Sequence, residues 1–101
     1  FRPGTAELNT FARALLAKTA AKLAQAGGQI AIEGHTDATG GGQSDANWQL
    51  SGARALAARQ AMIASGMTTD RFSEIVAMGG TRPVFPDQPD RAENRRITIV
   101  L

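Results

Sequence analysis

Two short segments set the architecture of this chain: Gly34-His35-Thr36-Asp37 and, beyond a glycine-rich gap, Asn47-Trp48-Gln49-Leu50-Ser51-Gly52-Ala53-Arg54-Ala55. Residues 30–34 alternate between apolar and other positions, which predicts a strand with one buried face. The alanine-rich run after Ser51 predicts a helix. An acid at the end of the strand, Asp37, and a base at the start of the helix, Arg54, can therefore converge on one cleft. Opposite charges placed in this way suit a zwitterionic ligand.

A further helical pattern occupies the N-terminal quarter of the chain. Apolar and small side chains recur at three- and four-residue steps between residues 5 and 26. We expect Thr5 to cap this helix and Gly27-Gly28 to close it. The expected buried face consists of Leu8, Phe11, Leu15, Leu16, Thr19 and Leu23.

The helix of the second segment is expected to run from an N-cap at Ser51 to about Ser65. Gly66 follows as the left-handed residue that ends it. The many alanines allow this helix to approach a sheet closely. Arg54 would then lie in the first turn, where the helix dipole disfavours a cation unless an anion completes the site.

Two more strands are expected, at residues 74–78 and 96–101, separated by a proline-rich loop at 83–89. Another strand is expected to end at Phe1. The order strand, helix, strand, helix, strand, strand implies one α/β domain over residues 1–101, an α+β sandwich of two layers. Its mixed sheet should carry the helices mainly on one face.

The composition argues against several classes of protein. The chain has 101 residues, no cysteine and a net charge of +2. The basic residues are scattered apart from Arg95-Arg96, so we expect no nucleic-acid partner. No apolar run approaches the roughly 20 residues that cross a bilayer. Because the chain opens without Met and ends inside an apolar run, we expect a fragment of a longer envelope protein.

Catalysis and metal binding are weaker hypotheses. His35 and Asp37 could serve Ser44 or Ser51 in a hydrolase, but they lie two positions apart on one strand and no Gly-x-Ser-x-Gly elbow occurs. A metal site built from Glu33, His35 and Asp37 lacks a second His or Cys. We therefore expect no catalytic residue, no metal and no cofactor.

Three motifs in this order and spacing resemble the OmpA-like peptidoglycan-binding domain: Gly34-His35-Thr36-Asp37, Asn47-x-x-Leu50-Ser51-x-x-Arg54-Ala55 and Asn94-Arg95-Arg96-Ile97. The likeness covers essentially the whole chain. Within the family, Thr81-Arg82-Pro83 and the residues around Asp37 and Asn47 are similar to MotB-type members, which belong to flagellar stators. Gly40-Gly41-Gly42 and Met78-Gly79-Gly80 depart from the MotB-type pattern.

The resemblance implies noncatalytic binding of peptidoglycan through the meso-diaminopimelate of its stem peptide. Asp37 matches the family's acceptor for the ligand ammonium, and Arg54 matches the fork that holds the ligand carboxylate. From the residues alone, Arg54 could also be solvated or paired with Asp37 to fix the loop. Asp37 could also be a turn residue that ends the strand.

The resemblance places five further residues at the site: Thr36, Asn47, Leu50, Arg95 and Arg96. We favour Asn47 as a residue that holds the loop, and Leu50 as a hydrophobic staple before the N-cap. Side chains alternate along a strand, so only one of Arg95 and Arg96 can face the cleft, and a solvated pair is the alternative. Trp48 could cover the core or stack beside the ligand.

The resemblance also implies where the domain works and with what. It implies a periplasmic domain, a homodimer and a MotA-like channel subunit as partner of the full-length protein. The inner-membrane anchor would lie in a segment outside this sequence. The alternative is a generic wall anchor of the outer-membrane-protein or lipoprotein (Pal-like) kind, and a peptidoglycan hydrolase is a remote one.

Overall fold

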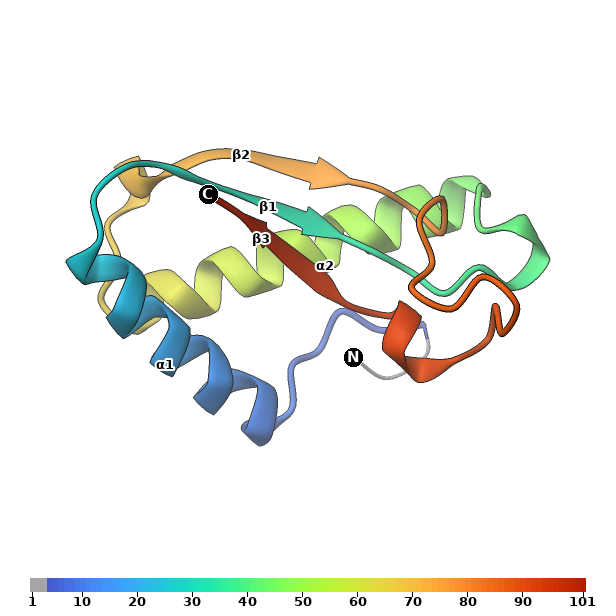
Figure 1. The fold of residues 1–101 in the computed structure, drawn as a ribbon, viewed down its shortest axis with the longest axis horizontal. Helices are drawn as coiled ribbons and strands as arrows, with labels where there is room; N and C mark the ends of the chain where they lie inside the picture. The colour runs from blue at the N-terminus through green and yellow to red at the C-terminus, as the bar shows by residue number, and fades with distance from the viewer. Residues whose placement is uncertain (1–3) are drawn as a thin grey trace.

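The computed structural model describes residues 4–101, in which two long helices pack on a small sheet (Figure 1). Three single-turn 3-10 helices occur in the connections. The long elements are α1 (Thr10–Gln25), β1 (Ile30–Gly34), α2 (Asp45–Ala64), β2 (Phe72–Ala77) and β3 (Ile97–Val100). The short ones are η1 (Thr39–Gly41), η2 (Thr69–Arg71) and η3 (Ala92–Asn94).

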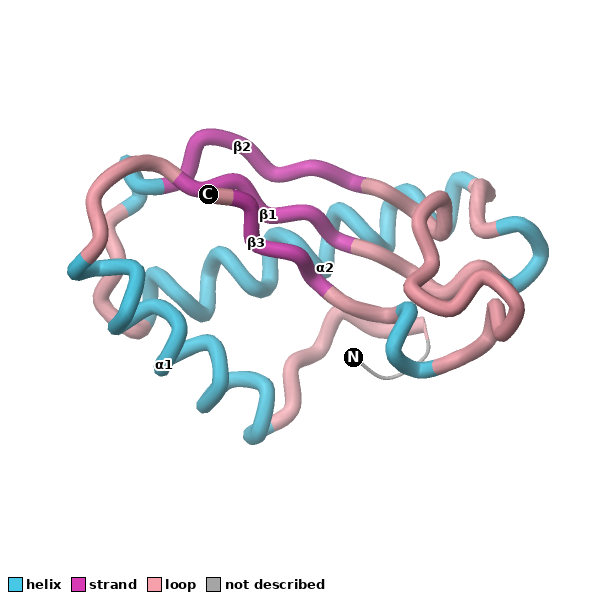
Figure 2. The backbone as a smooth tube through the Cα atoms, viewed as in Figure 1, coloured by secondary structure: helices cyan, strands magenta, loops and turns pink. Residues whose placement is uncertain are grey.

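The sheet is mixed, with the strand order β2-β1-β3. Its central strand β1 runs parallel to β2 and antiparallel to β3, and Gly34 pairs with both Ala77 and Ile97. The loops after β1, after β2 and before β3 therefore gather at one end of the sheet (Figure 2). This arrangement confirms the predicted two-layer α+β fold. The strand expected to end at Phe1 falls outside the described residues.

Both helices cover the same face of the sheet. The alternation along β1 turns Ile30 and Ile32 inward, as predicted. They meet α1 and α2 in one core that consists of Leu16, Ala20, Ile30, Ile32, Ala55, Ala58, Met62 and Met67. The backbone of α2 approaches β1 so closely that a Cβ at Gly34 would lie 1.7 Å from the carbonyl oxygen of Ser51. Burial of Ala55 and Ala58 allows this approach, as the alanine-rich sequence predicts.

The prediction for the start of α1 is wrong. The helix begins at Thr10, and the side chain of Asn9 caps it by accepting a 2.7 Å hydrogen bond from the Ala12 amide. Thr5 instead lies in the segment that precedes α1, where its backbone carbonyl accepts a hydrogen bond from the Arg54 side chain. An Asn nearer the apolar run therefore serves as the cap.

The predicted buried face of α1 is only partly correct. Leu16 and Ala20 are buried and Leu23 packs against the core, but Phe11 is 76% exposed and Leu15 is 55% exposed. Consecutive residues point about 100° apart on a helix. When the helix face that carries Leu16 and Ala20 packs on the core, Phe11 and Leu15 therefore point toward solvent. The spacing of apolar residues by three and four positions could not show which of these two neighbouring helix faces is buried.

The prediction for the start of α2 is also wrong. The helix begins at Asp45, with Ser44 as its N-cap. Ser51 is buried inside the helix, where its hydroxyl donates to the Trp48 carbonyl and accepts from the Gly79 amide, each at 2.9 Å. Arg54 therefore lies well inside the helix, and the expected dipole effect of the first turn does not apply to it. The end is as predicted, with Gly66 at a positive φ of 114°.

The later elements lie close to their predicted places. Strand β2 begins at Phe72, two positions before the expected 74, and β3 falls within the predicted range of 96–101. The proline-rich residues 83–89 form a loop as predicted.

Candidate functional site

A cleft of about 260 Å³ lies at the loop-rich end of the sheet, between the end of β1 and the N-terminal half of α2. Six of the seven residues that the sequence places at the site line this cleft, and Arg96 does not. The complete lining consists of Gly4, Thr36, Asp37, Ala46, Asn47, Leu50, Arg54 and Arg95.

Arg54 is the buried cation of this cleft. Its side chain is 0% exposed, and its Nε donates to the Thr5 carbonyl at 2.9 Å while its Nη1 donates to the His35 carbonyl at 3.1 Å. Burial lowers the pKa of Arg54 to about 10, with the like charge of Arg95 acting in the same direction and Asp37 against it. The guanidinium thus stays protonated at neutral pH, and two backbone carbonyls fix its orientation.

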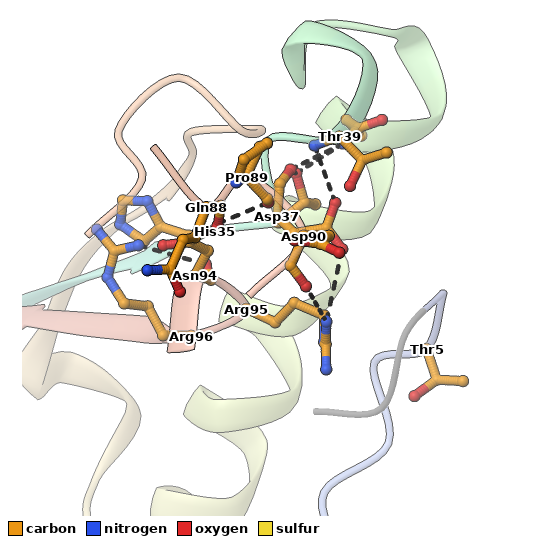
Figure 3. Close-up of polar contacts among 12 residues, drawn as sticks. Thr5, His35, Asp37, Thr39, Gln88, Pro89, Asp90, Asn94, Arg95 and Arg96 are labelled. Carbon is orange, nitrogen blue, oxygen red and sulfur yellow. Dashed lines mark hydrogen bonds and ion pairs between the residues drawn. The ribbon is translucent and has the colours of Figure 1, made fainter. Parts of the chain in front are cut away.

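Asp37 supplies the anion. Its Oδ1 accepts a 3.2 Å hydrogen bond from the Thr39 amide, so the carboxylate also serves the turn after β1. Its Oδ2 lies 3.5 Å from Nη1 of Arg95, and the Asp37 side chain is 23% exposed. Figure 3 shows these contacts of Asp37 with Thr39 and Arg95. The partly exposed carboxylate is therefore held in the lining of the cleft, where a ligand can reach it.

Asn47 and Thr36 connect α2 to the end of β1. The Asn47 Nδ2 donates to the Thr36 hydroxyl at 2.7 Å and to the Asp37 carbonyl at 3.5 Å. The backbone amide of Asn47 also donates to the hydroxyl of Ser44, the N-cap of α2. These bonds fit the predicted role of Asn47 in holding the loop.

Leu50 and Trp48 differ from one another in their positions. Leu50 lies within α2 and forms part of the cleft wall, so the predicted staple before the N-cap is wrong. Trp48 is absent from the cleft lining. Its ring packs against Gly79, where a Cβ would lie 3.3 Å from the indole Cε3.

Arg95 and Arg96 extend in different directions, as alternation along a strand predicts (Figure 3). Arg95 lines the cleft and pairs with Asp37. Arg96 donates from Nη2 to the Arg82 carbonyl at 2.8 Å, and its burial lowers its pKa. Arg96 thus holds the loop before β3, and Arg95 is the one residue of the pair that lines this cleft, in keeping with the expectation that only one of them faces it.

Asn94 is the residue whose function the sequence analysis missed. It is 0% exposed, and its side chain accepts from the Phe85 amide and donates to the Gln88 carbonyl, each at 3.0 Å. These bonds shape the loop that carries Arg95. A polar residue next to the Arg95-Arg96 pair was the available signal, but its burial could not be read from the sequence.

His35 faces away from the cleft, and the hypothetical hydrolase does not form around it. Its Nε2 lies 3.3 Å from the Glu33 carboxylate and 3.4 Å from the Thr98 hydroxyl. The hydroxyls of Ser44 and Ser51 serve as an N-cap and as a partner of Gly79. Within residues 4–101, no group of three or more metal-ligating side chains comes together.

The fold and the charged cleft define a class of small α+β domains that place a buried arginine and a rim carboxylate at the end of the central strand. Comparison with known families makes this class specific. The chain belongs to the OmpA family, whose model matches residues 1–96.

Two curated relatives illustrate the similarity in sequence. Motility protein B of Escherichia coli K12 is 32% identical over 104 residues, which cover 100% of this chain and 34% of that protein. The putative flagellar export/assembly protein LafU of Escherichia coli O44:H18 is 35% identical over 102 residues, which cover 100% of this chain and 33% of that protein. The chain thus spans about a third of the length of these two relatives.

Solved structures share the fold. The C-terminal domain of Helicobacter pylori MotB superposes with a TM-score of 0.84 at 20% identity, over 98% of this chain and 79% of that one. The cell wall anchor of the T6SS from Pseudomonas aeruginosa superposes with a TM-score of 0.77 at 28% identity, over 100% of this chain and 73% of that one.

Proposed function

We propose that this domain binds peptidoglycan without catalysis and anchors a flagellar stator complex to the cell wall. The single observation that carries the proposal is the cleft in which Asp37 and Arg54 lie together. Membership of the OmpA family and similarity to Motility protein B support it. The Pseudomonas aeruginosa neighbour, which shares the fold, is itself a cell wall anchor.

The proposed ligand is the side-chain end of meso-diaminopimelate, which bears an ammonium and a carboxylate on one carbon. Asp37 accepts the ammonium, and the Arg54 guanidinium receives the carboxylate. Because backbone carbonyls already orient Arg54, little side-chain entropy is lost when the ligand binds. Thr36, Asn47 and Leu50 shape the cleft around these two charges.

Co-sedimentation with purified sacculi tests the proposal. Asp37→Asn removes the charge but keeps the shape, and Arg54→Lys keeps the charge but removes the planar fork. Each variant is expected to weaken binding by about tenfold or more, because a hydrogen bond to a charged group is lost. Wild-type binding by both folded variants would contradict the site.

Matched controls exist outside the cleft. Arg59→Lys changes the same residue type on the same helix, where Arg59 lies over the Phe72 ring. Asp87→Asn changes an exposed acid in the proline-rich loop. Both controls are expected to bind sacculi as the wild type does. Release of soluble muropeptides by the wild type would instead support a hydrolase.

We also propose a periplasmic location, a homodimer and a MotA-like partner for the full-length protein. One of the solved structures that share this fold is the periplasmic domain of Helicobacter pylori MotB, which supports the location. No helix in residues 4–101 has the length and apolar character to span a bilayer. We propose that the inner-membrane anchor lies in a segment outside this sequence.

A general envelope anchor is the second candidate. It is favoured by the similarity to the cell wall anchor of the T6SS, an assembly other than the flagellar motor, over the whole chain. Deleting the domain from the full-length protein separates the two functions. Loss of swimming with an intact envelope indicates the stator, and envelope defects in swimming cells indicate the general anchor.

A further inference from the structure

The charges of the cleft do not balance those of a simple zwitterion. Its lining carries Asp37 as the anion and Arg54 and Arg95 as cations, so the sum over these described residues is one positive charge. An ammonium and one carboxylate add nothing to that sum. A ligand with one more carboxylate would neutralise it.

The two arginines are held very differently. Arg54 is fully buried, with contacts of 2.9 and 3.1 Å to backbone carbonyls. Arg95 keeps 12% of its side chain exposed, and its Nη1 lies 3.5 Å from both the Asp37 carboxylate and the Asp90 carbonyl. Both of these distances exceed the 2.7–2.9 Å typical of a strong charge-assisted bond. Arg95 is thus the cation that meets the rim carboxylate and keeps some exposure to solvent, whereas Arg54 is fully buried.

Binding of the ligand ammonium changes the electrostatic surroundings of Arg95. The ammonium pairs with the Asp37 carboxylate and so brings a second positive charge beside the guanidinium of Arg95. A ligand anion at the rim would offset the repulsion between these two cations. Since Arg54 already holds one ligand carboxylate under the proposed function, Arg95 is left to hold a second.

We propose that Arg95 binds a second carboxylate of the same stem peptide and so selects stems in which that group is not amidated. The inference rests on the proposed function. Two groups share this chemistry, the α-carboxylate of the D-glutamate that precedes diaminopimelate and the carboxylate at the C-terminal end of the stem. Asn94 positions Arg95 for this role by fixing the preceding loop (Figure 3).

Titration calorimetry with three synthetic peptides tests the proposal. The first is the N-acetylated tripeptide L-Ala-γ-D-Glu-meso-diaminopimelate. The other two each carry a carboxamide in place of one of the two candidate carboxylates. For the wild type, one amidated peptide is expected to bind about tenfold more weakly than the parent, and its identity names the source.

Variants of Arg95 show whether this residue is responsible. Arg95→Gln is expected to reduce the difference between the peptides to about twofold or less, as a double-mutant cycle with coupled partners requires. Arg95→Lys, which keeps the charge, is expected to retain part of the difference. Arg82→Gln makes the same change of net charge at an exposed residue and should retain all of it.

Other outcomes overturn the inference. Equal binding of all three peptides by the wild type would show that Arg95 holds no second carboxylate, while the proposed function would stand. Tighter binding of all three by Arg95→Gln would show that Arg95 only competes for Asp37. Binding of none of them by the folded wild type would remove the proposed function, and the inference with it.

Discussion

The cleft end of this small domain and the region along α1 are held together by different forces. At the cleft end, backbone contacts between loops dominate: the Thr36 amide donates to Gly79 at 2.9 Å, Ala38 to Pro89 at 2.8 Å and Gly80 to Gly42 at 2.7 Å. Along α1, by contrast, an apolar groove of about 420 Å³ separates the helix from β3. The groups of the cleft are thus positioned by hydrogen bonds between loops, whereas α1 is held by apolar contacts with the core.

Adding one methyl group at Gly34 tests the cleft end most severely. In Gly34→Ala the new Cβ would lie 1.7 Å from the Ser51 carbonyl oxygen, which is backbone and cannot rotate away. We expect a loss of about 3 kcal/mol or more in the free energy of unfolding, because α2 must separate from β1. Urea denaturation measures this loss.

Gly52→Ala is the matched control for that variant. A Cβ at this helical position would meet only the Ala77 Cβ at 3.6 Å, an ordinary contact. We expect this variant to be as stable as the wild type or slightly more so. Similar losses of unfolding free energy in both variants would contradict the expectation that only Gly34 lies too close to neighbouring backbone to carry a side chain.

The α1 side predicts a pair of unequal effects. Leu16→Ala removes a side chain that is 7% exposed and is expected to cost about 2–4 kcal/mol. Phe11→Ala removes a larger side chain that is 76% exposed and should change stability by less than about 0.5 kcal/mol. Thermal unfolding followed by circular dichroism compares the two. A larger loss for Phe11→Ala would restore the buried face that the sequence predicts.

The same contrast explains what the sequence could predict. Alternation in β1 and the ordered motifs identified the fold and brought Asp37 and Arg54 to one cleft, because both depend on local periodicity and spacing. The caps at Thr5 and Ser51 were wrong because Asn9 and Ser44 compete for the same role with similar propensities. Which of them caps depends on tertiary contacts, such as the bond between Ser51 and Gly79.

Removing the Ser51 hydroxyl should have a moderate effect. In Ser51→Ala the buried Gly79 amide loses its 2.9 Å acceptor, and an unsatisfied buried donor costs about 1–3 kcal/mol. Ser65→Ala, at the exposed end of α2, serves as a control that should cost less. Amide hydrogen exchange should show faster exchange at Gly79 in Ser51→Ala. Unchanged protection there would mean that this bond does not hold the loop to the helix.

The smallest expected effect is a pH dependence from His35, which follows β1 and whose imidazole lies beside Glu33 and Thr98. Burial, with Arg96 and Arg82 adding to it and Glu33 opposing it, lowers the pKa of this imidazole below its ordinary value. The unfolded chain therefore takes up the proton first as the pH falls, so stability should decline below about pH 6.5 and level off beneath the lowered pKa.

The His35 backbone connects this titration to the cleft, because its carbonyl accepts from Arg54 at 3.1 Å and its amide donates to the Arg96 carbonyl at 2.8 Å. Protonation should therefore weaken sacculus binding together with stability. Melting temperatures between about pH 7.5 and 5.5 measure the slope, and His35→Gln should flatten it because Gln carries no titrating group. An equal slope in that variant would assign the pH dependence to other groups. A rise in stability on acidification would mean that the attraction of Glu33 outweighs burial.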